Sequence, residues 1–177
     1  KIHKYLSLAI SVQLLLWTIS GIYFSFNEIE DIRGSQYLKE IKAVETFKGN
    51  KIELEQALLI VTDKTFLKPI STIEITDDKA GSEYRGRSLP LYKVETIDED
   101  NKKINVYLDP YSEKIVATRS NQWRVWDFMW GIHIMDWNER DNIGNIFLKI
   151  FSILALLSAI SGIYLFFATN NRSKGST

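Results

Sequence analysis

From Tyr5 to Phe26 the chain reads YLSLAISVQLLLWTISGIYFSF, a run of 22 residues without a charge. At a rise of about 1.5 Å per residue, this run forms a helix of about 33 Å, enough to cross a hydrocarbon core of about 30 Å. A second uncharged run of 19 residues extends from Ile150 to Ala168, and Lys149 precedes it, where its ammonium group can reach the lipid headgroups. The sequence therefore predicts two transmembrane helices, at 5–26 and 143–169.

The first run has a second interpretation, a cleaved signal peptide. Its apolar stretch is longer than the core of about 7–15 residues found in signal peptides. No cleavage site with small residues follows before Asn27. We therefore favour a membrane anchor.

Charge is unevenly distributed along the chain and predicts its orientation. All 22 acidic residues and 17 of the 22 basic ones lie between Glu28 and Asp141, whereas both tails, 1–4 and 170–177, carry only cations. Short cationic segments next to transmembrane helices remain in the cytoplasm. We therefore expect two cytoplasmic tails and an extracytoplasmic central region.

The composition excludes several classes of protein. The chain contains no cysteine, which excludes a disulfide-stapled domain, a zinc ribbon and a thiolate catalyst. Its formal net charge is zero, so it lacks the basic excess of a nucleic-acid-binding protein. We expect a lipid bilayer and protein subunits as partners, and no nucleic acid.

The central region predicts a small α+β module over 50–120, which a linker at 27–49 joins to the first transmembrane helix. Leu54, Ala57 and Val61 recur with helical spacing, which indicates an amphipathic helix over 51–64. Alternating apolar residues indicate strands near 72–76, 92–96, 104–108 and 115–118. The module shows no catalytic constellation, because it lacks histidine and cysteine and its acids lie mostly at turns.

This order of elements resembles the PepSY domain. The resemblance rests on IELEQALLIV at 52–61 and on LYKVETIDEDNKKINVYLDPYSEKIVA at 91–117. The last turn of the family usually reads Asp-x-x-Thr-Gly-Glu, whereas this chain has Glu113 in place of the glycine. The flanking segments KIHKYLSLAISVQLLLWTISGIYFSF and GIHIMDWNERDNIGNIFLKIFSILALLSAISGIYLF resemble those of PepSY-associated transmembrane proteins.

The resemblance covers nearly the whole chain and implies a protein of the bacterial inner membrane with a periplasmic module. PepSY modules are implicated in peptidase inhibition, in sensing and as periplasmic parts of larger membrane proteins. Longer relatives with four spans are similar to siderophore-iron reductases, whose membrane histidines ligate haem b. This chain has half that complement of spans.

An aromatic stripe precedes the second span. Trp123, Trp126, Trp130, His133 and Trp137 are separated by three or four residues, so they share one face of a helix that we predict over 121–138. The opposite face carries Arg124, Asp127 and Asp136. We expect this helix to lie in the outer membrane interface with its rings at the headgroup level.

The two histidines of the chain, His3 and His133, have two interpretations. In the first, His3 is an ordinary residue of the tail and His133 is a member of the aromatic belt. In the second, both are candidate axial ligands of haem b. Because they are predicted on opposite sides of a layer of about 30 Å, they cannot bind the same iron. A haem would need a second histidine from another chain, and the sequence itself requires no cofactor and indicates no metal site.

Small residues on the transmembrane helices indicate helix packing. The string at 19–23, Ile-Ser-Gly-Ile-Tyr, recurs at 160–164. Ser158 and Gly162 are four residues apart and share a face, as packing faces of membrane helices do. Gly21 is a further candidate contact, and Gln13 is expected to hydrogen-bond to another helix.

Two functional hypotheses follow. The first is a membrane-anchored accessory subunit that is not catalytic by itself. It would bind a membrane or periplasmic partner, or a second copy of itself, and use the sheet edge or the loop Arg85-Gly86-Arg87. The alternative is transmembrane electron transfer to an acceptor such as a ferric complex. Two haem b groups would then lie between two copies of the chain, an inner haem bound by two His3 side chains and an outer haem bound by two His133 side chains.

Overall fold

The structure is a computed structural model that describes the backbone of residues 2–39 and 49–174, and the side chains of 5–39 and 49–165. Two long helices lie at the ends of the described chain, α1 (Ile2–Phe26) and α5 (Ile146–Lys174). Between them lie α2 (Ile29–Arg33), the 3₁₀ helix η1 (Ser35–Tyr37), α3 (Leu54–Lys64), β1 (Lys68–Ile75), β2 (Leu91–Ile97), β3 (Lys103–Leu108), β4 (Ile115–Arg119) and α4 (Asn121–His133). This order agrees with the fold class that the sequence predicts.

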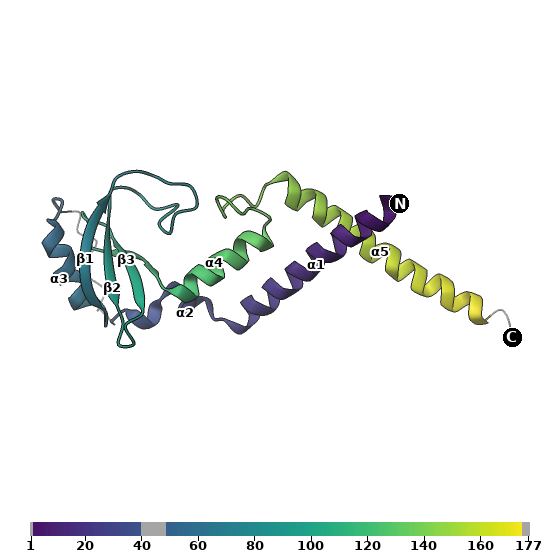
Figure 1. Ribbon diagram of the computed structural model, residues 1–177, viewed down its shortest axis with the longest axis horizontal. Helices are drawn as coiled ribbons and strands as arrows, with labels where there is room; N and C mark the ends of the chain where they lie inside the picture. The colour runs from purple at the N-terminus through teal and green to yellow at the C-terminus, as the bar shows by residue number, and fades with distance from the viewer. Residues whose placement is uncertain (1, 40–48, 175–177) are drawn as a thin grey trace.

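Both long helices contain a segment that is long and apolar enough to cross a membrane. These segments are Tyr5–Phe26, which has the predicted bounds, and Ile146–Leu165, which lies within the predicted 143–169. The two helices do not lie side by side: α5 crosses α1 obliquely, near the N-terminal end of α1 (Figure 1). None of the apolar segment of α5 is buried inside the chain.

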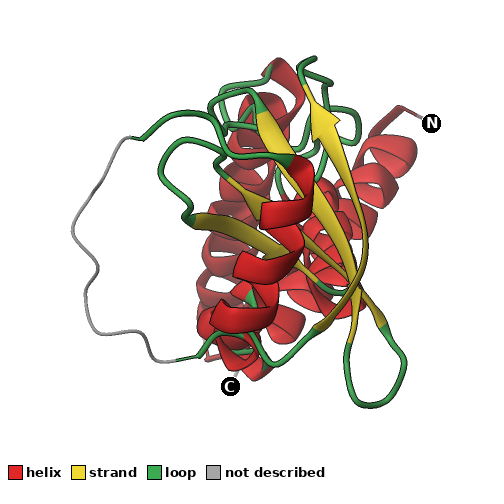
Figure 2. Ribbon diagram, turned by 90° about the vertical axis from the view of Figure 1, so that its left-hand side faces the viewer, coloured by secondary structure: helices red, strands yellow, loops and turns green. Residues whose placement is uncertain are grey.

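The central module is a four-stranded antiparallel meander in the order β1-β2-β3-β4. Helix α3 covers one face of the sheet, and the other helices lie on the opposite side (Figure 2). The core between α3 and the sheet is apolar and closed, as the predicted periodicity requires. Its buried residues are Ala57, Val61, Leu67, Tyr92, Val94, Ile104, Val106 and Leu108.

The turn between β3 and β4 contains a glutamate at the position where the resemblance leads one to expect glycine. Glu113 has φ +55°, a left-handed conformation that usually favours glycine. Its amide donates to the carbonyl oxygen of Asp109 at 3.0 Å, and its own carbonyl accepts from Lys64 Nζ of α3 at 2.6 Å. These bonds hold the turn in place and tie it to the helix.

The linker and α4 differ from the predictions. The linker contains α2 and η1, while its part at 40–48 lies outside the described residues. Helix α4 ends at His133 and not at 138, because Met135 turns the chain with φ +56°. Trp137 therefore lies beyond the helix and is exposed. Helix α4 runs beside α1 in the opposite direction (Figure 1).

Candidate functional site

The C-terminal end of α4 is bound to the transmembrane helix α1. His133 Nδ1 lies 2.8 Å from Ser20 Oγ, and Trp17 Nε1 donates to the backbone oxygen of His133 at 2.7 Å. Ser20 is fully buried. Because Trp17 and Ser20 are three residues apart on one helix, the end of α4 is attached at two points within one turn.

The aromatic stripe of α4 packs on α1. The ring of Phe24 lies 5.4 Å from Trp126, 6.3 Å from Trp130 and 5.6 Å from His133, between ring centroids. Trp126 and Trp130 stack on each other at 5.6 Å. Helix α1 thus supplies aromatic partners for this stripe, and the location of α4 in the outer membrane interface stays a prediction.

The residues of α1 that contact His133 lie within the apolar segment Tyr5–Phe26. Ser20 precedes the end of that segment at Phe26 by about 9 Å of helix. His3 falls in the first turn of α1, and its side chain lies outside the described residues. About 26 Å of helix separates it from Ser20. The backbone positions agree with the prediction that the two histidines cannot share an iron.

Asp127, which was predicted from the sequence to lie on the face opposite the aromatic stripe, is a buried carboxylate next to that stripe, three residues from Trp130 and four from Trp123. Asp127 is 1% exposed. Its Oδ1 pairs with Arg85 of the long loop between β1 and β2, and its Oδ2 accepts from Arg140 Nη1 at 2.6 Å. A single side chain therefore fixes α4 both to the sheet module and to the segment that leads to α5.

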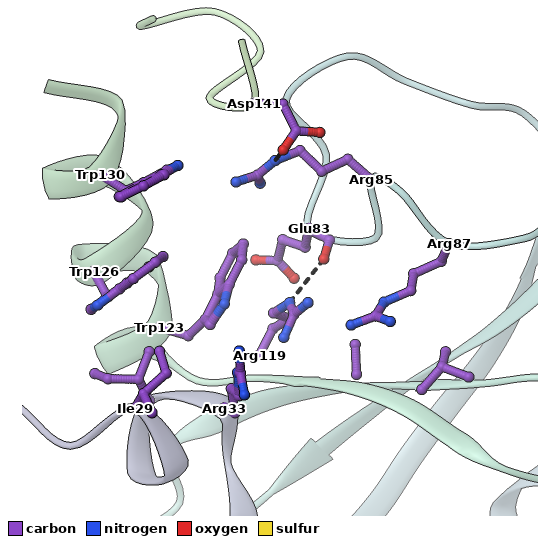
Figure 3. Close-up of a pocket in the computed structure, with 13 residues that line it drawn as sticks. Ile29, Arg33, Glu83, Arg85, Arg87, Arg119, Trp123, Trp126, Trp130 and Asp141 are labelled. Atoms are coloured by element: carbon purple, nitrogen blue, oxygen red, sulfur yellow. Dashed lines mark hydrogen bonds and ion pairs between the residues drawn. The ribbon is translucent and has the colours of Figure 1, made fainter. Parts of the chain in front are cut away.

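A cavity of about 470 Å³ lies between α4, α2, β4 and the long loop (Figure 3). Four guanidinium groups line it, against two carboxylates. Its walls are formed by Ile29, Ile32, Arg33, Glu83, Arg85, Arg87, Val116, Ala117, Arg119, Trp123, Trp126, Trp130 and Asp141. The cavity therefore combines positive charge with an indole wall.

One of the two carboxylates, Glu83, is engaged by neighbours outside the cavity lining. Its Oε1 accepts from Arg124 Nε at 2.6 Å, and its Oε2 accepts from Asn105 Nδ2 at 2.7 Å and from Tyr107 at 3.0 Å. Burial by itself raises the pKa of Glu83, but these hydrogen bonds outweigh it, so the pKa is lowered. Glu83 therefore remains ionised at neutral pH, paired with Arg124.

The packing glycines and serine contact no other helix within the described chain. A Cβ atom added at Gly21 or Gly162 would have no neighbour within 4 Å, and Ser158 is exposed. Gln13 is 6% exposed, and its Nε2 has no hydrogen-bond partner among the described residues. Among the described residues, the predicted packing at Gly21, Ser158 and Gly162 is thus not made, and the predicted hydrogen bond of Gln13 is not formed.

Comparison with known proteins gives one match. The family model of the PepSY-associated TM region matches residues 1–177. The chain belongs to this family. No curated protein and no solved structure matches it. This family membership confirms the predicted PepSY-associated membrane protein. The fold agrees with it, because two apolar helices flank a helix and a four-stranded sheet.

Most of the cavity residues of this PepSY-associated protein were not predicted from the sequence. The loop with Arg85 and Arg87 was predicted as a possible binding surface, whereas Arg33 and Arg119 were not predicted to belong to any site. A signal for Arg119 was present, because it lies two residues after Ala117 on the same face of β4, and both residues are buried. Alternation predicts that such a position points inward. An inward arginine on an otherwise apolar face indicates a polar site.

We predict that Asp127→Asn loosens α4 from the sheet module and lowers the free energy of unfolding by about 2–4 kcal/mol, because both arginines then lose their carboxylate. The matched control is Asp141→Asn, whose side chain is 67% exposed and lies 3.9 Å from the same Arg85; its effect should stay below about 0.5 kcal/mol. Denaturant unfolding of the full chain in detergent measures both. Equal effects of the two substitutions would contradict the structural role given to Asp127.

Proposed function

We propose that this chain is a membrane-anchored accessory subunit, not catalytic by itself, that transmits contacts of its PepSY-like module to neighbouring membrane subunits. The double attachment of α4 is the observation that carries the proposal. One side of α4 is fixed to the module through Asp127, and its end is fixed to α1 through His133. A displacement of the module would therefore move α1.

We further propose that the module faces the periplasm of a bacterial inner membrane. The support is the distribution of charge. Every acidic residue lies between the two membrane segments, from Glu28 to Asp141. The outer flanks of these segments are cationic and contain Lys1, Lys4, Arg172 and Lys174. Cationic flanks remain in the cytoplasm, which leaves the acidic module on the other side.

Helix α5 offers the surface for a partner subunit. Its apolar segment is unburied in the chain, and it repeats the string of α1 that receives α4. In the first copy of the string, Ser20 contacts His133 of α4. In the second copy, the matching Ser161 is exposed and bonds to the backbone of its own helix, at Ser158. A partner helix can occupy on α5 the place that α4 occupies on α1.

We predict that Ser158→Leu combined with Gly162→Leu abolishes co-purification of partner subunits, because bulky side chains prevent close approach of helix backbones. Ser152→Leu is the matched control, since it adds the same side chain to another face of α5. Extraction of the tagged chain in mild detergent, with cross-linking and mass spectrometry, gives the readout. Purification of the unsubstituted chain as a monomer without stoichiometric partners, or identical partners in all variants, would contradict the proposal.

A second candidate function, haem-based electron transfer, is favoured by the hydrogen bond of His133. In the Nδ1–H tautomer of His133, Nδ1–H donates to Ser20 Oγ, and the Ser20 hydroxyl donates to the carbonyl oxygen of Leu16 at 2.9 Å. The lone pair then lies on Nε2, which has no hydrogen-bond partner among the described residues. A ligating imidazole is oriented in this way through its other nitrogen.

The residues present fit one axial ligand per chain. His133 would hold the iron from one side and a second copy of the chain would supply the other imidazole, while Ser20 keeps the ring in place. Bound haem b would supply one-electron transfer. The rings of Trp17, Phe24 and Trp130, whose centroids lie between 5.6 and 6.4 Å from that of His133, would exclude water from the imidazole.

We predict, on this second candidate, that protein purified from haem-replete cells shows the reduced-minus-oxidised spectrum of a bis-imidazole haem b. His133→Ala should remove the outer-haem component of that spectrum, whereas Ser20→Ala should retain the haem and change its reduction potential, because the hydrogen bond to the ligand is lost. A colourless protein from such cells would exclude this function and leave the accessory role untouched.

A further inference from the structure

Arg119 is a buried cation without a carboxylate partner in the described part of the chain. It is 8% exposed. Its Nε donates to the backbone oxygen of Glu83 at 2.9 Å and its Nη1 to that of Thr118 at 3.2 Å. These carbonyl oxygens accept hydrogen bonds from the guanidinium group but do not neutralise its positive charge. A buried charge without an opposite charge beside it costs free energy of folding.

The surroundings of Arg119 keep it charged and hold it in position. Its guanidinium lies 4.2 Å from the centroid of the Trp123 ring, a favourable cation–π arrangement. Burial lowers the pKa of Arg119 to about 10, and the nearby Arg87 contributes to that lowering. Below that pKa the cation persists, so at neutral pH Arg119 presents a fixed positive charge to the cavity.

Two further arginines add charge without a partner. The side chains of Arg33 and Arg87 form no ion pair among the described residues, in contrast to Arg85, which pairs with Asp127. The side chain of Arg87 extends toward Arg119, and Arg33 lies on the other side of it (Figure 3). Three guanidinium groups that face one space suit a multidentate oxyanion, because each presents several N–H donors.

The cavity also lies close to the membrane surface. Its floor includes Ile29 of α2, which follows the end of the transmembrane segment at Phe26 after two residues. Its wall includes Trp126 and Trp130, which contact Phe24 of that segment. An anionic group at the level of the lipid headgroups can therefore reach the arginines while its apolar part remains beside the indoles.

We propose that this cavity binds a phosphate ester, with Arg119, Arg87 and Arg33 as the ligands of the phosphate oxygens. The source of the ester is the headgroup of an anionic phospholipid or a soluble organic phosphate of the same chemistry. Binding neutralises the buried cation of Arg119 and links the sheet, through β4, to α2 and α4. It is independent of partner binding by α5 and of haem.

The test uses the full chain in neutral detergent and three probes: short-chain phosphatidylglycerol, glycerol 3-phosphate, and short-chain diacylglycerol, which lacks the phosphate. Native mass spectrometry and tryptophan fluorescence report binding. Arg87→Gln with Arg33→Gln removes two exposed cations that hold no structural ion pair among the described residues. The control is Lys68→Gln, which removes one exposed positive charge outside the cavity lining, on β1 at the far edge of the sheet. Arg119→Gln is added, with its thermal unfolding checked first.

Phosphatidylglycerol should bind saturably, and the Arg87 and Arg33 substitutions should weaken it at least about tenfold, as expected for lost charge-assisted hydrogen bonds. Lys68→Gln should change it by less than about twofold. If glycerol 3-phosphate competes with the same arginine dependence, the source is a soluble ester; if only the lipid binds, it is the membrane. Equal binding of diacylglycerol, binding that is insensitive to Arg87 and Arg33, or no binding of either phosphate overturns the proposal.

Discussion

The packing of α4 against α1 is the interaction on which the rest of the structure depends. Helix α1 contains the first of the two apolar segments, and the sheet module follows it after short α2 and η1. The bonds of Trp17 and Ser20 to His133, with the aromatic contacts of Phe24, hold α4 along α1. Since α4 directly follows β4, its position sets where the sheet lies relative to the membrane.

Helix α4 has two differently built sides. One side is aromatic and meets the transmembrane helix, where Trp17 and Ser20 hydrogen-bond to His133 while the rings pack their apolar area. The other side carries Asp127, whose buried charge is compensated by two arginines. The cavity lies where these two sides and the sheet meet. A ligand, a partner or a cofactor that acts there would therefore act on the connection between module and membrane.

The sequence predicted those features that local periodicity determines. The uncharged run Tyr5–Phe26 has the bounds of the membrane segment, and the helical spacing of Ala57 and Val61 identified buried residues of α3. Periodicity shows which residues share a face, but not what covers that face. The partners of Asp127 lie 42 and 13 residues away at Arg85 and Arg140, so its burial and the cavity could not be derived from spacing. The stripe of α4 was identified correctly as far as Trp130 and His133, but its partner, α1, was not.

The most direct measurement is the proximity of α4 and α1 in native membranes. The chain contains no cysteine, so thiols can be placed freely. Phe24→Cys with Trp126→Cys replaces two contacting rings, 5.4 Å apart, and leaves the Ser20 to His133 contact intact. A short thiol-specific cross-linker should join this pair within one chain. The control pair, Ser25→Cys with Trp126→Cys, moves one thiol to an exposed neighbouring face and should react little. Equal cross-linking of both pairs, or none in the first, would contradict the account of α4 as the rigid connection between the sheet and the membrane.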